Sequence, residues 1–163
     1  MKKLIIAVLL IVGGTGISNA QKMGHANFEE IVGLLPERAA AEKEIQDLQQ
    51  TLEGRLNKMV ETYQAKVQEF ESDTTMPQAM QASVAGEIQD LQRRIQEFQQ
   101  TAYTEIETKQ NELMAGLFEK VRTAAGAVGE AEGYTYIFDA SSGALMYAGG
   151  EDVTGKVKGQ LGL

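Results

Sequence analysis

Between Ile45 and Val121 the apolar residues recur every three or four positions, the spacing that places them on one face of an α-helix. A single polar interruption, residues 72–78, divides the pattern into two series. The first series is Ile45, Leu48, Leu52, Leu56, Met59, Tyr63, Val67 and Phe70. The second is Met80, Val84, Ile88, Leu91, Ile95, Phe98, Ala102 and Ile106. Folded at the interruption, the two series pair in reverse order, which predicts two antiparallel helices that share one apolar seam.

The segment before this arm predicts one strand and one short helix. Lys22 to Ala26 is a candidate strand, and Asn27 is a good N-cap for a helix that ends at Leu35. Pro36 cannot donate a backbone hydrogen bond, so it either kinks this helix or begins the next one.

The segment after the arm predicts two strands and a last helix. The return helix continues to Gly133, and Tyr134 to Phe138 is rich in the aromatic and β-branched residues of strands. A turn at 141–143 precedes a second predicted strand, Ala144 to Ala148. Asp152 or Thr154 can cap the final helix.

The predicted fold class is therefore α+β, mainly α. A long antiparallel helical hairpin, residues 36–121 with its tip at 72–78, extends from a small β/α body made of residues 21–35 and 122–163. With five Phe, five Tyr and no Trp, the core of such a chain is a line along the seam, and oligomerisation at the base is expected to add to its stability.

The first twenty residues have the features of a cleaved signal peptide. Lys2 and Lys3 are followed by an apolar run from Leu4 to Val12 and a small-x-Ala site that ends at Ala20. An uncleaved N-terminal anchor is the alternative. Cleavage near Ala20 predicts a protein outside the cytoplasm.

Charge and residue types exclude several functions. Loss of Lys2 and Lys3 changes the formal net charge from −8 to −10, which disfavours nucleic acid and anionic lipid surfaces. There is no Cys, and His25 is the only histidine, so we expect neither a metal site nor a cofactor. Asp139 and Gly149-Gly150 lack the partners or spacing of a catalytic or phosphate site. The sequence predicts no enzyme.

The remaining candidates are flexible or aromatic side chains on the arm, which suit contact with an apolar partner. Most of them fall on the seam, where packing of the hairpin competes with binding, whereas the two tip methionines are expected to be more exposed. The candidates for partner binding are Met59, Tyr63, Phe70, Met76, Met80 and Phe98.

The order of these parts, with two local segments, resembles the OmpH-like (Skp) family of periplasmic chaperones. The segments are Lys22 to Asn27, with Leu35-Pro36-Glu37 behind it, and Glu132 to Ala140, followed by Tyr147 and Asp152-Val153-Thr154. The resemblance implies a homotrimer whose β-rich bodies associate and whose arms surround a cavity that holds unfolded outer-membrane proteins without ATP. The candidates for the trimer body are Tyr134, Tyr136, Ile137, Phe138, Leu145 and Tyr147.

One feature departs from the family. Its best-known members are basic, with arms suited to lipopolysaccharide and membrane surfaces, whereas this chain is acidic. Binding of lipopolysaccharide or of a membrane surface is therefore not carried over, and clients with basic segments are expected. The alternative function is a structural coiled-coil module that tethers or spaces cell-envelope components.

Overall fold

The structure is a computed structural model, and it describes residues 21–163. The predicted signal peptide, residues 1–20, lies outside the described residues. None of the helices within 21–163 combines the length and apolar character needed to cross a membrane. The elements in chain order are β1 (Met23–Ala26), α2 (Phe28–Leu34), α3 (Pro36–Ser72), α4 (Gln78–Glu132), β2 (Tyr136–Asp139), β3 (Glu151–Asp152) and α5 (Thr154–Leu161).

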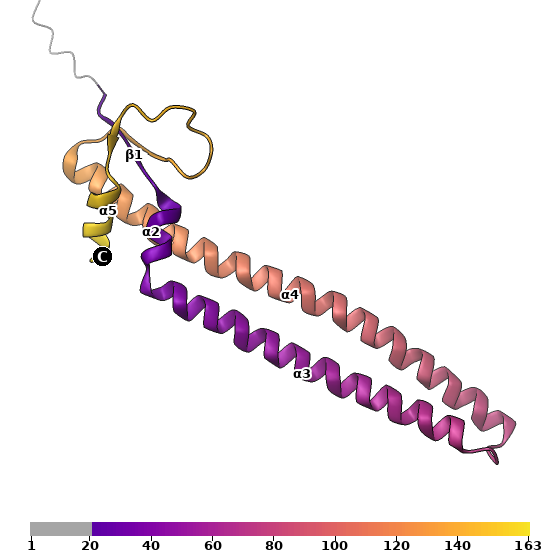
Figure 1. Cartoon of the computed structure of the whole chain (residues 1–163). Helices are drawn as coiled ribbons and strands as arrows, with labels where there is room; N and C mark the ends of the chain where they lie inside the picture. The colour runs from indigo at the N-terminus through magenta and orange to yellow at the C-terminus, as the bar shows by residue number, and fades with distance from the viewer. Residues whose placement is uncertain (1–20) are drawn as a thin grey trace, which may run out of the picture. The chain divides into compact units, whose positions relative to one another are not determined.

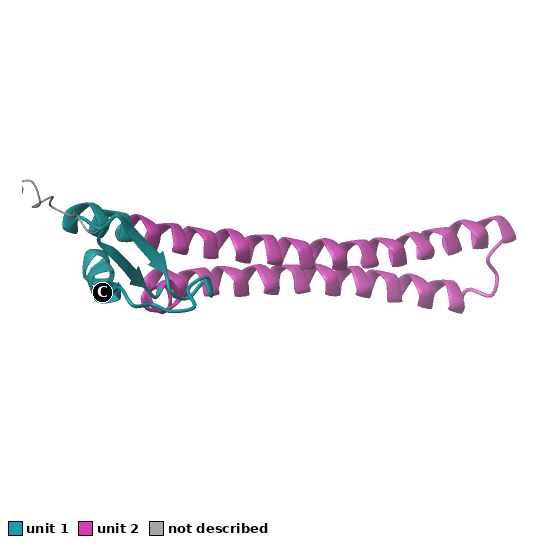
Figure 2. Cartoon of the chain, turned by 90° about the horizontal axis from the view of Figure 1, so that it is seen from above, with its two compact units in different colours: residues 1–27, 124–162 teal, residues 28–123, 163 magenta. Residues whose placement is uncertain are grey.

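The chain divides into two compact units, which Figure 2 colours separately. Unit 1 contains the segment up to Asn27 and residues 124–162, and unit 2 contains residues 28–123. Helix α4 runs through both. From the sequence we expect a body made of residues 21–35 and 122–163, and this division stays a prediction. In the structure α2 belongs to unit 2, together with the arm.

Unit 2 is dominated by the antiparallel pair of α3 and α4, which lie side by side in Figures 1 and 2. At 1.5 Å per residue, the 37 residues of α3 span about 55 Å. Every residue of the two predicted seam series is buried or half-buried except Met80. Ion pairs between the helices, Lys66–Glu87 and Lys109–Glu44, follow the register of the seam. The helical hairpin is confirmed.

The tip is held by local polar contacts. The backbone N–H and hydroxyl of Thr75 both donate to Asp73 Oδ1, at 3.0 and 2.8 Å. These bonds lower the pKa of Asp73, because they favour its ionised form. The Gln81 side chain donates to the Met76 carbonyl oxygen, and the backbone N–H of Met80 and of Gln81 donate to that of Pro77. Pro77 therefore precedes α4 at a position where a missing N–H costs nothing.

Unit 1 contains a three-stranded parallel sheet in the order β2-β1-β3. Met23 pairs with Tyr136 and His25 with Phe138, so these four side chains share one face of the sheet. Behind β1, a Cβ at Gly24 would lie 3.1 Å from the Tyr134 ring. The ring thus packs directly on the strand backbone, which explains why Tyr134 is buried.

The second predicted strand, Ala144 to Ala148, is wrong. These residues form a loop, and the third strand is β3, Glu151–Asp152. A strand requires a neighbour with free backbone groups, and β1 offers one side to β2 and the other to β3. Gly150 permits this pairing, since a Cβ there would lie 2.9 Å from the Met23 carbonyl oxygen.

Candidate functional sites

The arm candidates fall into two environments. The seam residues Met59, Tyr63, Phe70 and Phe98 are half-buried between α3 and α4. Met76 at the tip is half-buried too, so the expectation that both tip methionines are more exposed than the seam is wrong for Met76. Met80 lies at the start of α4 with 58% of its surface exposed. Met80 is therefore open to a partner, whereas the seam residues each present one side. Their role in binding stays a prediction.

The seam pattern in the sequence did not identify three further exposed apolar side chains on α4. Tyr103 is 68% exposed, and Met114 and Phe118 are also exposed. All three lie outside the two paired series, and a large apolar residue that breaks the seam period on a polar helix face was the signal that could have revealed them.

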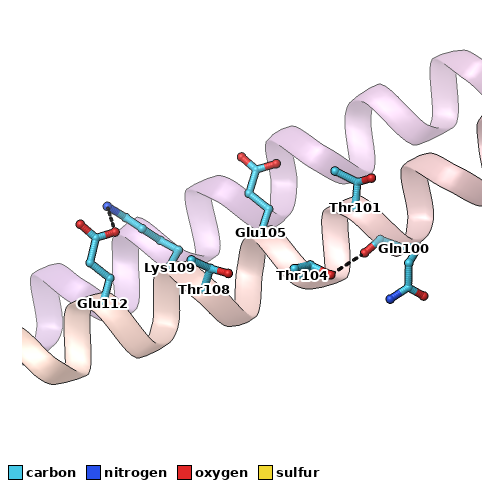
Figure 3. A pocket seen from close by; sticks show the side chains of 7 residues that line it. All are labelled: Gln100, Thr101, Thr104, Glu105, Thr108, Lys109 and Glu112. Atoms are coloured by element: carbon cyan, nitrogen blue, oxygen red, sulfur yellow. Dashed lines mark hydrogen bonds and ion pairs between the residues drawn. The ribbon is translucent and has the colours of Figure 1, made fainter.

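Two shallow grooves lie on the arm near Tyr103. The first, of about 340 Å³, runs over the seam and is lined by Leu52, Leu56, Phe98, Ala102 and Ile106, with Tyr103 in its wall. The second lies on α4, and Figure 3 shows its polar lining from Gln100 to Glu112. Several of its polar groups are engaged in the arm itself. Thr101 and Thr104 donate to the carbonyl oxygens of Glu97 and Gln100, and Lys109 pairs with Glu44. The first groove is an apolar contact surface, and neither contains the paired nucleophile and base of an active site.

One face of the sheet in unit 1 is apolar and open. Tyr136 and Phe138 are 52% and 42% exposed, and their rings stack with centroids 6.0 Å apart. Met23 on the same face and Met146 and Tyr147 in the following loop are also exposed. A small cavity of about 180 Å³ lies between this face and the loop, where Leu145 is half-buried. We call Met23, Tyr136, Phe138, Met146 and Tyr147 the sheet-face cluster.

The remaining body candidates differ from the sheet-face cluster. Tyr134 is buried against Gly24, and Ile137 is half-buried beside Gly129. These two side chains stabilise the body from within, so a contact with another copy is left to the exposed residues.

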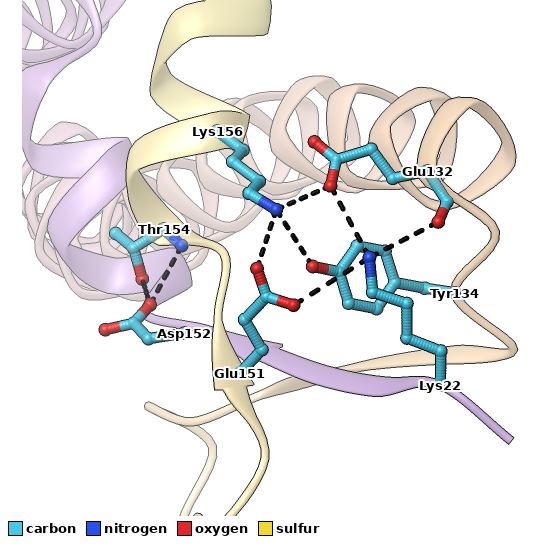
Figure 4. A network of polar contacts seen from close by, with 7 residues as sticks. All are labelled: Lys22, Glu132, Tyr134, Glu151, Asp152, Thr154 and Lys156. Atoms are coloured by element: carbon cyan, nitrogen blue, oxygen red, sulfur yellow. Dashed lines mark hydrogen bonds and ion pairs between the residues drawn. The ribbon is translucent and has the colours of Figure 1, made fainter. Parts of the chain in front are cut away.

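A polar network on unit 1 ties its chain segments together (Figure 4). Lys156 of α5 binds Glu132 at the end of α4, Glu151 Oε1 at 2.7 Å and the Tyr134 hydroxyl at 3.0 Å. Lys22 lies over the Tyr134 ring, 3.8 Å from its centroid. The hydrogen bond from Lys156, followed by that from Tyr134, lowers the pKa of Glu151 from its ordinary 4.5 to about 2. The same carboxylates raise the pKa of Lys156.

This network predicts that unit 1 loses stability at acidic pH. A lowered Glu pKa stabilises the fold fully above pH 4.5, and that stability is lost as the pH falls towards 2. Glu132 and Asp152 have lowered pKa values too, and they shift stability in the same direction. Lys156→Met should therefore raise the midpoint pH of acid unfolding, as followed by the near-UV circular dichroism of the tyrosines. Lys43→Met removes an exposed pair within α3 and is the matched control; an equal shift in both variants would contradict the network's role.

The chemistry of the described residues offers no reaction centre. Within residues 21–163 no cluster of three His, Asp or Glu side chains could hold a metal ion. His25 lies on β1, and its Nδ1 is buried without a hydrogen-bond partner among these residues. Asp139 accepts from the backbone and hydroxyl of Ser141, so it caps a turn.

These features define a helical arm with an apolar groove and a small parallel sheet, and the chain belongs to the OmpH-like outer membrane protein family, whose model matches residues 22–161. The resemblance drawn from the sequence is confirmed. The chain is 24% identical to the chaperone protein Skp of Pectobacterium atrosepticum over 169 residues, which cover 99% of each chain. It also resembles the crystal structure of an OmpH-like outer membrane chaperone from Caulobacter crescentus CB15, with a TM-score of 0.71 and 18% identity, over 91% of this chain and 88% of that one. The comparisons support a chaperone role, and the family is not one of enzymes.

Proposed function

We propose that this chain is an ATP-independent holdase chaperone of the periplasm that binds unfolded outer-membrane proteins and prevents their aggregation. Three copies would associate through their bodies, and clients would be held between the arms. The Skp and OmpH-like relatives are chaperones by name, which supports the client class. The signal peptide predicted for residues 1–20 supports the compartment.

The observation that carries this proposal is the incomplete burial of the arm. In a two-helix hairpin each helix covers only one side of the other. Of the seam residues that we predict in α3, only Leu52 is buried, and the others keep part of their apolar surface in contact with water. Together with Tyr103 and Met80, this surface offers many weak apolar contacts along α3 and α4. Such contacts tolerate varied sequences and release them without an energy source.

The sheet-face cluster supports assembly. Five large, exposed apolar side chains gather on one face of the sheet and the adjoining loop. Exposed apolar patches of this kind mark interaction surfaces. Association through this face would leave the arms, which belong to the other unit, available to clients.

The direct test dilutes a urea-unfolded β-barrel protein into buffer with the mature chain, residues 21–163, and follows light scattering. Near-stoichiometric amounts should keep the client in solution without ATP, because each complex encloses one client. An unrelated acidic helical protein at the same concentration is the control. If the client aggregates as fast with the mature chain as with the control, the holdase proposal fails. One tight envelope partner without general suppression would indicate the tethering role.

A further inference from the structure

Most, but not all, of the basic residues in the described part of this acidic chain are paired with a carboxylate. Nine of the thirteen Lys and Arg side chains in residues 21–163 form salt bridges with carboxylates. Lys158 also has an interaction partner. The three described cations that remain, Arg55, Lys58 and Arg94, are exposed and have no ion pair or side-chain hydrogen bond.

These three cations line the same groove, although they come from both helices of the arm. Arg55 and Lys58 are on α3, and Arg94 is on α4. The groove has a volume of about 510 Å³, and Met59 and Phe98, both half-buried, form its apolar part. We call it the basic groove.

One carboxylate also lines the basic groove, but it is already engaged. Glu97 Oε1 accepts a hydrogen bond of 2.8 Å from Arg93 Nη1, and Arg93 also binds Asp90. Arg93 is shared by Glu97 and Asp90, so it offsets the charge of Glu97 only in part. Three cations against one carboxylate still give the lining a net positive charge, within a chain whose overall charge is negative.

The chemistry of this lining selects an anion with apolar neighbours. A guanidinium binds a carboxylate through two parallel hydrogen bonds, and Lys58 adds a third donor that can rotate. Met59 adapts its shape to varied apolar groups. A volume near 500 Å³ lies within the range of ligand pockets and holds a few side chains.

The occupant that these features favour is a polypeptide. Attraction to an anionic bilayer takes a cluster of four to eight basic residues, roughly, and this groove has three in a chain of net charge −8. Nucleic acid requires several phosphate contacts, which three cations do not supply. A groove that runs across an interhelical seam, with charge at its rim and apolar side chains within, suits an extended segment that alternates acidic and aromatic residues.

We propose that the basic groove binds acidic, aromatic-containing segments of unfolded clients. This inference rests on the proposed holdase function and specifies where on the arm a charged part of the client lies. From the net charge of the chain we expected the arm to prefer basic segments. Salt screens charges beyond a Debye length of about 8–10 Å, so the local cations decide the preference of this groove.

The test uses fluorescence anisotropy with the mature chain and three labelled peptides. One peptide alternates Asp and Glu with Phe and Tyr, the second has Gln at each acidic position, and the third has Lys there. The mature chain should bind the acidic peptide most tightly, and this preference should weaken as salt is added. The triple variant Arg55→Gln, Lys58→Gln, Arg94→Gln should lose about tenfold in affinity for the acidic peptide, since three charge-assisted contacts are removed. Its affinity for the Gln peptide should not change.

The matched control is Arg38→Gln, Lys43→Gln, Arg122→Gln, which changes the charge equally but removes cations already paired on the arm. It should alter the acidic peptide's affinity less than about twofold. An equal loss in both triple variants, or no preference for the acidic peptide, overturns the proposal. So does a loss of oligomer by light scattering in the first variant alone, which would make the groove a contact between copies. A loss of binding to vesicles of equal parts phosphatidylcholine and phosphatidylglycerol in the first variant alone would point to lipid instead and likewise overturn it.

The β-barrel client assay separates this proposal from the holdase function on which it rests. If the mature chain keeps the client soluble but the two triple variants bind the acidic peptide alike, the basic groove proposal fails and the holdase function stands. If the mature chain holds no client, the holdase function fails, whatever the peptides do.

Discussion

Phe138→Asp is expected to convert the protein from an oligomer to a monomer. Phe138 is 42% exposed on the open face of the sheet, where it stacks on Tyr136. If this face joins the copies, the substitution places a carboxylate against an apolar partner in each of them. Loss of a central aromatic from an interface costs about 2 kcal/mol or more, roughly thirtyfold in the dissociation constant per contact, and a buried charge adds to it.

Light scattering coupled to size-exclusion chromatography measures this result directly. The mature wild-type chain should run as a trimer, and the Phe138→Asp variant as a monomer with unchanged helicity by far-UV circular dichroism. Tyr103→Asp is the matched control, since Tyr103 is also an exposed aromatic but lies on α4 within the arm unit. A wild-type monomer, or a Phe138→Asp variant that stays fully assembled, would contradict association through the sheet face.

Leu52→Asp is expected to destabilise the arm strongly. Leu52 is the one seam residue of α3 that is fully buried, with 3% of its surface exposed. Removal of a buried Leu side chain costs about 2–5 kcal/mol, and an unpaired charge in its place costs more. A free energy of unfolding lower by about 4 kcal/mol follows, with the largest loss of helical signal expected in residues 36–121.

Urea unfolding followed by far-UV circular dichroism tests the change at Leu52. Gln50→Asp, on the exposed side of the same helix, is the control and should cost less than about 1 kcal/mol. Leu91→Asp, at a half-buried seam position of α4, should fall between the two. If Leu52→Asp and Gln50→Asp unfold at the same urea concentration, the seam is not what holds the hairpin together.

The sequence was sufficient for the arm because a helical hairpin is encoded locally. Ile45 to Phe70 and Val84 to Ile106 repeat with the period of a helix, and the polar tip between them leaves only one way to pair the two series. Each seam position needs only its own neighbours three and four residues away to be recognised. The exception, Met80, is exposed because it begins α4, where little of α3 remains to cover it.

The body was predicted less well because its strands depend on distant partners. Ala144 to Ala148 has the composition of a strand, but β1 has already paired with β2 and with Glu151–Asp152, so no ladder is left for it. Short strands take their identity from the neighbour they pair with more than from propensity. Tyr134 was expected with the residues of the trimer body, yet it packs on Gly24, a contact between segments more than a hundred residues apart.

The sequence by itself determined the hairpin, its tip, the acidic balance and the family, since each depends on residue type and local spacing. Only the tertiary structure decided which apolar side chains stay exposed and which cations have no carboxylate partner. It placed the sheet-face cluster on one open face and brought Arg55, Lys58 and Arg94 from two helices to one groove. Neither result could be read from the chain, because pairing of charges depends on which carboxylates the fold brings within reach of each cation. The candidate binding surfaces of this chaperone are therefore made of apolar side chains that its fold leaves exposed and of cations that it leaves without a carboxylate partner.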